Sequence, residues 1–331
     1  MMVAGSAGQP YHASRRCGTG IANNGLSGMD RSTPLVTVVV PTFNGAPTLR
    51  SALASLIGQD CAEFEALVVG DGCTDDSEAV VRSFDDPRLT WHNLPVNSGS
   101  QSAPNNHAAS RARGRWIAYL GHDDLWFPWH LSGLLQAAAD SGAEFLHSTC
   151  LMLHPDGRHQ VTGPLGIGRS HADQFTPPSS WLHRRDVIDR VGAWRSPSEL
   201  AYGVDFDYQR RSVLAGCRFA HAPRLSVLKF PSGWWGNYDH SRPHPQADYL
   251  ERIVAGPLDV ERDLLGDLVQ QYASEAHGAR PGRPLRAAVQ ALTRRIADGY
   301  GRDRWPLSAL LFWRQQRFIR RNRPRRGLPA R

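Results

Sequence analysis

Lysine is almost missing from this chain of 331 residues: Lys229 is the only one, and arginine supplies the other basic side chains. The net charge at pH 7 is +7. Because an arginine bias of this kind is typical of GC-rich genomes, the positive balance alone does not indicate a nucleic-acid or membrane partner. Its distribution says more, since residues 304–331 contain many arginines and no acidic residue.

Three further absences narrow the class of protein. No run of about 18 apolar residues occurs, so no transmembrane helix is expected. The N-terminal residues lack the continuous apolar segment of a secretory signal, so none is expected there. The cysteines are odd in number and lack C-x-x-C spacing, which argues against a disulfide framework or a zinc site: Cys17, Cys61, Cys73, Cys150 and Cys217. We therefore expect a cytoplasmic protein.

Composition divides the chain into three parts. Residues 1–33 are rich in Gly, Ser, Ala and Asn without periodicity, and we expect them to be disordered. Residues 34–246 carry the hydrophobic segments of one large globular domain. Residues 247–331 are polar with helical periodicity, and we expect a helical C-terminal extension that ends in the basic tail.

Strands and helices alternate through the first half of the domain. Leu35–Val40 is β-branched and apolar on both faces, as in a strand buried in a parallel sheet, and Pro41 ends it. A helix with apolar residues at helical spacing follows, and the cycle repeats. The alternation predicts an α/β fold with a mostly parallel sheet flanked by helices. Further strands are expected in 64–72, 89–95, 115–121 and 143–153, and helices in 46–59, 75–84, 102–114 and 128–142.

Polar side chains follow three of these strands. Thr42 and Asn44 come after the first, Asp71 after the second, and Asp123 with Asp124 after the fourth. In an open parallel sheet, ligands bind beyond the carboxyl ends of the strands. A carboxylate there accepts from a base N–H or a ribose hydroxyl, and paired carboxylates suit Mg²⁺ or Mn²⁺ held against phosphate oxygens. The pattern therefore predicts a site for a nucleoside diphosphate and a divalent cation.

In order and spacing, these segments resemble the family 2 glycosyltransferases, which have the Rossmann-like GT-A fold. The resemblance covers residues 35–230 and is carried by VTVVVPTFNGAPTLRSALASLIGQ, ALVVGDGCTDDS and NSGSQSAPNNHAASRARGRWIAYLGHDDLW. It implies an inverting enzyme that takes a sugar from a nucleotide-diphosphate donor with the help of a divalent metal ion, Mg²⁺ or Mn²⁺.

The resemblance also implies roles for individual residues. Asp123 falls on the metal-binding acid of the family's D-x-D motif, and Asp124 beside it is a second candidate ligand. The stretch YGVDFDYQRR is similar to the segment with the catalytic base, so Asp205 takes the base position and Asp207 braces the following helix. Inversion needs such a carboxylate to deprotonate the acceptor hydroxyl. The expected nucleotide-sugar-binding residues are Pro41, Thr42, Asn44, Asp71, Asn97, Gly99 and His122.

Several positions depart from the family pattern. Gly121 stands in place of the first acid of D-x-D, where His122 or Asp124 would have to compensate. The other departures are Pro104 and His107 in place of Arg and Gly, Val204 in place of Glu, and Pro231 in place of His. They keep open the alternative of a catalytically inactive homologue that only binds a sugar nucleotide.

Each candidate carboxylate also has a structural alternative. Asp71 lies in an Asp-Gly pair, a common turn sequence. Asp124 suits a cap for the helix entered at Pro128, and Asp205 lies near a helix start. The tail has two interpretations as well: a basic amphipathic helix on an anionic membrane, which would favour a lipid-linked acceptor, or a helix packed on the domain.

The expected function is transfer of a sugar, from a UDP-sugar by default, to a hydroxyl of a glycan, a lipid-linked saccharide or a small molecule. The protein would act in the cytoplasm or at the membrane periphery. PTFNGAPT lacks the Gly-rich basic loop of a nucleotidyltransferase and the G-x-G-x-x-G of a dehydrogenase, which disfavours both. No nucleic-acid partner is expected, since the aromatic residues of the tail cluster in one segment.

Overall fold

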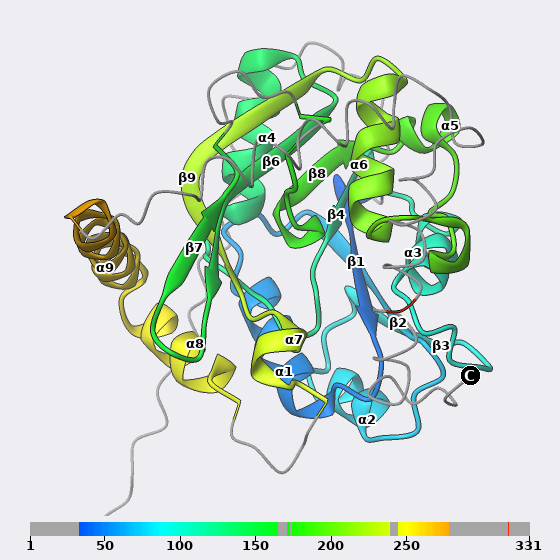
Figure 1. The fold of residues 1–331 in the computed structure, drawn as a ribbon. Coiled ribbons are helices and arrows are strands. Elements are labelled where there is room, and N and C mark those ends of the chain that lie inside the picture. Colours follow the sequence, from blue (N-terminus) through cyan, green and yellow to red (C-terminus); the bar gives the residue numbers. More distant parts are fainter. Residues whose placement is uncertain (1–32, 165–170, 173, 239–243, 278–316, 318–331) are drawn as a thin grey trace, which may run out of the picture.

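The computed structural model of the chain describes residues 33–164, 171–172, 174–238, 244–277 and 317. Its centre is a mixed sheet with strand order β3-β2-β1-β4-β8-β6-β9-β5, and β7 pairs with β6 beside this path (Figure 1). The strands are β1 Val36–Thr42, β2 Phe64–Gly70, β3 Leu89–Asn93, β4 Trp116–Tyr119, β5 Leu125–Trp126, β6 Phe145–Leu153, β7 His159–Thr162, β8 Trp181–Arg184 and β9 Phe219–Lys229.

Strand β1 is buried on both faces, as its run of β-branched residues predicts. Val36, Val38 and Val40 pack on one face with α1, α2 and α4, whereas Val39 packs on the other face with α3, α5 and α6. Because helices cover both faces of the sheet, a ligand can approach it at the carboxyl ends of the parallel strands β1 to β4. These helices are α1 Ala46–Ile57, α2 Ser77–Arg82, α3 Ser102–Ala109, α4 His130–Ser141, α5 Val187–Val191 and α6 Val204–Leu214.

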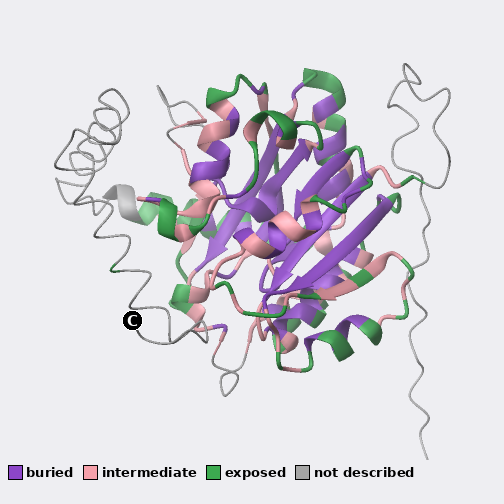
Figure 2. Cartoon of the chain, turned by 90° about the vertical axis from the view of Figure 1, so that its right-hand side faces the viewer, coloured by how far each residue is buried: buried purple, intermediate pink, exposed green. Residues whose placement is uncertain are grey.

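The predicted fold class is confirmed, but the short strands β5 and β8 were not predicted from the sequence. β8 runs antiparallel between β4 and β6, and β5 runs antiparallel to β9. Both are too short, at four and two residues, to show an alternating pattern. The sheet is still mostly parallel, because β6 and β9 run in the same direction as the first four strands. Figure 2 shows that buried residues concentrate in these strands.

The helices α7 Ser232–Trp235, α8 Gln246–Ala255 and α9 Pro257–His277 follow β9. In α9, Val260, Leu264 and Leu268 are buried in an apolar cluster with β9. Next to β7, the side-chain oxygen of Gln271 accepts the His159 N–H at 2.7 Å, and its Nε2 donates to the His159 carbonyl at 3.0 Å. Helix α9 therefore contacts β7, the outer strand of the β6–β7 hairpin.

The boundaries expected from composition are only partly within the described residues. Of the expected disordered segment 1–33, the structure describes residue 33 alone. Of the expected extension 247–331, it describes α8 and α9, which are helical, whereas the basic tail apart from Arg317 lies outside the described residues. Within the part that is described, no helix is long and apolar enough to cross a membrane.

Candidate active site

A cleft of about 410 Å³ opens at the carboxyl ends of β1, β2 and β4, the edge where the sequence predicts a site. We call it the strand-end cleft. Its walls come from the loops after these strands, the start of α6 and the segment after β9. Eight of the ten predicted site residues line it: Pro41, Thr42, Asp71, Asn97, Gly99, His122, Asp123 and Asp205.

Asn44 and Asp124 are the two predicted site residues that do not line this cleft. Asn44 has a φ of 43°, in the left-handed region that Asn tolerates better than most residues. Its Oδ1 accepts the Thr74 N–H at 2.8 Å, and its own N–H donates to Cys73 Sγ at 3.3 Å. Asn44 therefore joins the loop after β1 to the loop after β2, beside the cleft.

Asp71 holds one side of the cleft in place through its hydrogen bonds. Its carboxylate accepts the Ser98 N–H and hydroxyl, both at 3.0 Å, and the Gly99 N–H at 3.1 Å. Burial raises the pKa of Asp71, although these hydrogen bonds oppose the rise. Gly72 after it has a φ of 71°, and a Cβ there would lie 2.6 Å from the Asn97 nitrogen, so glycine is required at this position. Asp71 thus fixes the loop that forms one side of the cleft.

Asp123 is held in place from the opposite side. Its Oδ2 accepts the Ser232 hydroxyl and the Asn237 Nδ2, both at 2.7 Å, and its main-chain carbonyl accepts from Gln246 at 3.0 Å. Burial alone would raise its pKa, but the charges of His122 and Lys229 and the two hydrogen bonds outweigh burial and lower it. The carboxylate is therefore ionised, and no described residue donates to its Oδ1.

Asp124 points the other way, into the protein, where it is fully buried. Its Oδ2 accepts the Lys229 Nζ at 2.9 Å and the Ser179 hydroxyl at 2.5 Å, and its Oδ1 accepts the Phe230 N–H at 3.1 Å. It makes no contact as a cap of α4. A Cβ at Gly121 would lie 2.8 Å from Asp124 Oδ2, so the missing first acid of D-x-D leaves room for this carboxylate.

His122 lies on the wall between Pro41 and Tyr238. Its Nδ1 is 3.4 Å from the Pro41 carbonyl, and its ring centroid is 6.0 Å from that of Tyr238. A Cβ at Gly45 would be 2.5 Å from His122 Cδ2, so glycine is required where α1 begins beside the ring. The close packing orients the imidazole at the edge of the cleft.

Asp205 enters the cleft from the first turn of α6. Gly203 is the residue before that helix, and a Cβ there would be 2.5 Å from Asp205 Oδ1, so glycine leaves the space that the carboxylate occupies. The Phe206 N–H donates to Oδ1 at 2.8 Å. Burial raises the pKa of Asp205, opposed by this hydrogen bond and by the charge of Lys229. A carboxylate with a raised pKa is a stronger base when it is ionised.

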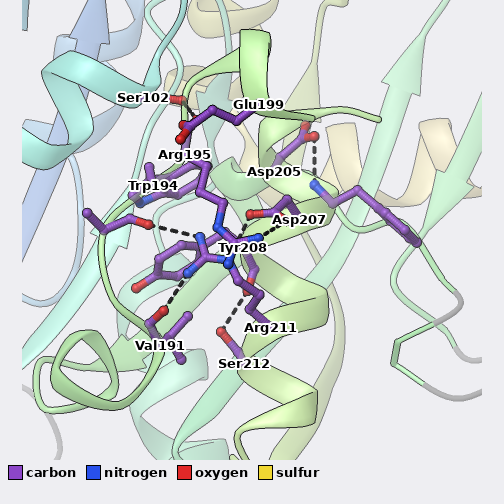
Figure 3. Close-up of polar contacts among 12 residues, drawn as sticks. Ser102, Val191, Trp194, Arg195, Glu199, Asp205, Asp207, Tyr208, Arg211 and Ser212 are labelled. Atoms are coloured by element: carbon purple, nitrogen blue, oxygen red, sulfur yellow. Dashed lines mark hydrogen bonds and ion pairs between the residues drawn. The ribbon is translucent and has the colours of Figure 1, made fainter. Parts of the chain in front are cut away.

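The remainder of α6 is anchored by Asp207, as the sequence predicts (Figure 3). Asp207 accepts from Arg211 Nε at 2.7 Å and lies 3.5 Å from Arg195 Nη1. Arg211 also donates to the carbonyls of Val191 and Ala193, which lie in the segment before the helix. This network fixes the direction in which the first turn of α6 presents Asp205.

Four polar residues around the aspartates were missed from the sequence: Ser179, Lys229, Ser232 and Asn237. They contact Asp123 or Asp124 from positions 55 to 114 residues away in the chain. Only Lys229 carried a usable signal, because it is the sole lysine of the chain.

The departures from the family pattern gather at the same cleft. Gly121, Pro104, Val204 and Pro231 all line it. His107 instead packs its ring against His92, with centroids 5.0 Å apart. Within the described residues, no group of three or more His, Cys, Asp or Glu side chains is arranged to hold a metal ion. Asp123 is the one predicted metal ligand that faces the cleft.

Comparison with known proteins finds similarity to glycosyltransferases. Residues 37–155 match the model of Glycosyl transferase family 2. The succinoglycan biosynthesis protein ExoO of Rhizobium meliloti is 35% identical over 125 residues, which are 38% of this chain and 36% of that protein. The chain therefore spans about a third of the length of this relative.

Two solved structures are similar over most of the chain. S. aureus TarS 1–349 in complex with UDP-GlcNAc has a TM-score of 0.52 at 17% identity, over 89% of this chain and 93% of that one. The mannosyltransferase PcManGT from Pyrobaculum calidifontis, in complex with GDP-Man and Mn²⁺, has a TM-score of 0.50 at 18% identity, over 87% and 86%. At these identities the likeness shows the fold. Residues 37–155, which carry most of the strand ends around the cleft, are thus similar to glycosyl transferase family 2, and the domain has the fold of these glycosyltransferase structures.

Proposed function

We propose that the protein is an inverting glycosyltransferase that moves a sugar from a nucleotide-diphosphate donor to an acceptor hydroxyl. One observation carries the proposal: Asp71, Asp123 and Asp205, which are far apart in the chain, line a single cleft at the strand ends. The nucleotide would lie against Pro41, Thr42, Asp71, Asn97 and Gly99, with His122 beside it. Asn44 would act by shaping the loop after β1.

A UDP-sugar is the default donor, and the TarS complex with UDP-GlcNAc supports this choice. The acceptor is a hydroxyl of a glycan, a lipid-linked saccharide or a small molecule. A relative named for succinoglycan biosynthesis favours a glycan.

We place the protein in the cytoplasm, with peripheral membrane contact through the basic tail. If residues 304–331 are removed, sedimentation with anionic liposomes should fall, and unchanged sedimentation would exclude this contact.

Asp205 is the proposed general base. The acceptor oxygen attacks the anomeric carbon of the donor while its proton passes to the Asp205 carboxylate. The bond from that carbon to the diphosphate oxygen breaks, and its electron pair stays on the diphosphate. Because attack and departure occur on opposite faces of the sugar, the configuration at the anomeric carbon inverts. The network of Asp207 and Arg211 keeps α6 in the orientation that this step needs.

Asp123 is suited to hold a divalent cation. Its Oδ2 is fixed by Ser232 and Asn237, its Oδ1 accepts no hydrogen bond from a described residue, and its pKa is low. Mg²⁺ is commonly held by one or two carboxylates together with substrate phosphates, so a single protein ligand is compatible with this ion. The ion, Mg²⁺ or Mn²⁺, would neutralise charge on the diphosphate. The PcManGT complex with Mn²⁺ supports the assignment.

A thermal-shift screen tests the binding half of the proposal. UDP, GDP and dTDP, and their sugars, are added with and without Mn²⁺. We expect one nucleotide to raise Tm in the presence of the metal, because a ligand that binds only the folded state stabilises it. If no nucleoside diphosphate changes Tm, the proposal is wrong.

Hydrolysis of the donor separates an enzyme from an inactive homologue. The wild-type protein should hydrolyse the nucleotide sugar slowly in the absence of acceptor, and Asp205→Asn should not. Equal rates in the two proteins would identify the chain as a binding module without catalysis.

A further inference from the structure

Lys229, the last residue of β9, reaches the strand-end cleft with a side chain that is 21% exposed. Its Nζ donates to Asp124 Oδ2 at 2.9 Å, which is its one hydrogen bond to a described residue. An ammonium group has three donors. The contact with Asp124 therefore leaves donors for a ligand in the cleft.

The side chains that line the cleft carry more negative than positive charge. Asp71, Asp123 and Asp205 contribute carboxylates to its lining, and Lys229 is the only lysine or arginine among the described residues that line it. Helix α3 presents Pro104 to the cleft and no basic side chain. A diphosphate brings further negative charge into this space, where the carboxylates repel it. Close to these acids, a fixed positive charge is needed.

We propose that the Lys229 ammonium binds the diphosphate of the donor and keeps this contact as the sugar leaves. The inference rests on the proposed function and extends it to a residue outside the predicted site. Lysine suits this role because its ammonium is a compact point charge on a flexible stem. It stays protonated and supplies charge alone, while the proton of the acceptor goes to Asp205.

Asp124 then has a role that differs from metal binding. It holds the ammonium at the floor of the cleft, and Ser179 and the Phe230 N–H hold Asp124 in turn. Gly121 belongs to the same unit, because a side chain there would enter the space of Asp124 Oδ2. The absence of the first acid of D-x-D and the presence of the lysine are thus one arrangement.

A purely structural ion pair is the competing explanation, and a pair of variants separates the two. Asp124→Asn alone keeps the ammonium, whereas Asp124→Asn with Lys229→Met removes it together with its buried partner. Replacing both members of a buried pair avoids an uncompensated charge, so the double variant should fold, whereas Asp124→Asn leaves the ammonium without its carboxylate and should be less stable. Circular dichroism melting confirms folding before any binding measurement.

Calorimetric titration with UDP, with GDP in parallel, and with uridine is then carried out in Mn²⁺. Compared with Asp124→Asn, the double variant should bind the diphosphate about 10- to 100-fold more weakly, the effect of losing one charge-assisted hydrogen bond. It should bind uridine equally well, because uridine has no diphosphate. Lys229→Arg keeps the charge and should retain most of the affinity.

Equal diphosphate affinity in the two variants would overturn the inference and leave the proposed function intact. An equal loss for UDP and uridine would also overturn it, because the whole pocket would then have changed. If the wild-type protein binds neither UDP nor GDP, the proposed function fails and the inference fails with it.

Discussion

The two walls of the strand-end cleft hold their side chains in different ways. On the first, formed after β1 and β2, main-chain groups do the work: the Asp71 N–H donates to the Thr42 carbonyl at 2.8 Å, and the Asp71 carboxylate accepts from the backbone of Ser98 and Gly99. On the second, formed by the loop after β4, α6 and the segment after β9, side chains supply most of the contacts, as when Asn237 and Ser232 bind Asp123, although Asp205 accepts from the Phe206 N–H. The first wall is therefore part of the fold, and the second is more independent of it.

This difference implies that substitutions in the second wall change chemistry with little loss of stability. The largest effect is expected for Asp205→Asn, which should lower kcat about 10²- to 10⁴-fold, the usual contribution of a general base. Affinity for UDP and the free energy of unfolding should be nearly unchanged. Steady-state kinetics and urea unfolding measure the two quantities, and a loss of stability comparable to the loss of rate would contradict the comparison.

The pH profile sharpens the same point. Asp205 acts only when it is ionised, and burial raises its pKa above the ordinary carboxyl value. Activity should therefore be full above that pKa and decline as the pH falls through it. The acid limb of kcat/KM should be absent from the residual activity of Asp205→Asn; an unchanged limb would assign it to another group.

In the first wall, Asp71→Ala should affect folding and binding together. It leaves the Ser98 N–H without its acceptor, whereas the Gly99 N–H keeps Asn97 Oδ1 and the Ser98 hydroxyl keeps the Ser100 carbonyl, so the expected cost is roughly 1–3 kcal/mol in the free energy of unfolding. UDP affinity should fall as the loop moves. Chemical denaturation checks the first effect and calorimetry the second. A variant of wild-type stability with lost affinity would show that Asp71 acts on the ligand alone.

Asn237→Ala tests the support of Asp123. Substitution of a residue that hydrogen-bonds to a metal ligand usually lowers metal affinity by about 10- to 100-fold. We expect UDP binding to require a higher Mn²⁺ concentration, with little change in the binding of uridine. Ser232→Ala removes the second donor to the same oxygen and should have a similar effect. If neither variant alters the Mn²⁺ concentration required, Asp123 does not need this support.

The smallest effect is expected for Gly203→Ala. The added Cβ would lie 2.5 Å from Asp205 Oδ1, so the carboxylate must turn aside, and we expect about a tenfold loss in kcat. Gly133→Ala in α4 is the control, because a Cβ there meets nothing within 4 Å. Equal rates for the two variants would mean that Asp205 has room to adjust.

The sequence predicted the first wall well because that wall depends on strand ends. Once β1 and β2 are recognised as parallel neighbours, Thr42 at the end of β1 and Asp71 after β2 must lie at the same end of the sheet. Asn44 shows the limit of this reasoning: it follows β1 as expected, but its left-handed φ turns the side chain toward Thr74. A positive φ at a residue other than glycine has no clear signature in a single sequence.

The second wall was predictable only in part: the strand-end pattern indicates Asp123 and Asp124, whereas the role of Asp205 came from the resemblance to a family. Asp123 and Asp124 are adjacent, yet one faces the cleft and the other faces Lys229, 105 residues away. Nothing local distinguishes them, because the partner that orients Asp124 comes from β9. Asn237 is 114 residues from Asp123 for the same reason. Contacts between distant side chains appear only when the whole sheet is assembled.

The amide of Gln271 has a consequence for the outermost strand. It forms hydrogen bonds with both main-chain groups of His159, as a residue of a neighbouring strand would. Without it, the N–H and C=O of His159 would be unpaired at the outer edge of β7. Exposed strand edges recruit other chains into mixed sheets. Helix α9 thus covers part of the β7 edge. We expect a protein shortened to end before α9 to pair through this edge and to elute as oligomers in size-exclusion chromatography.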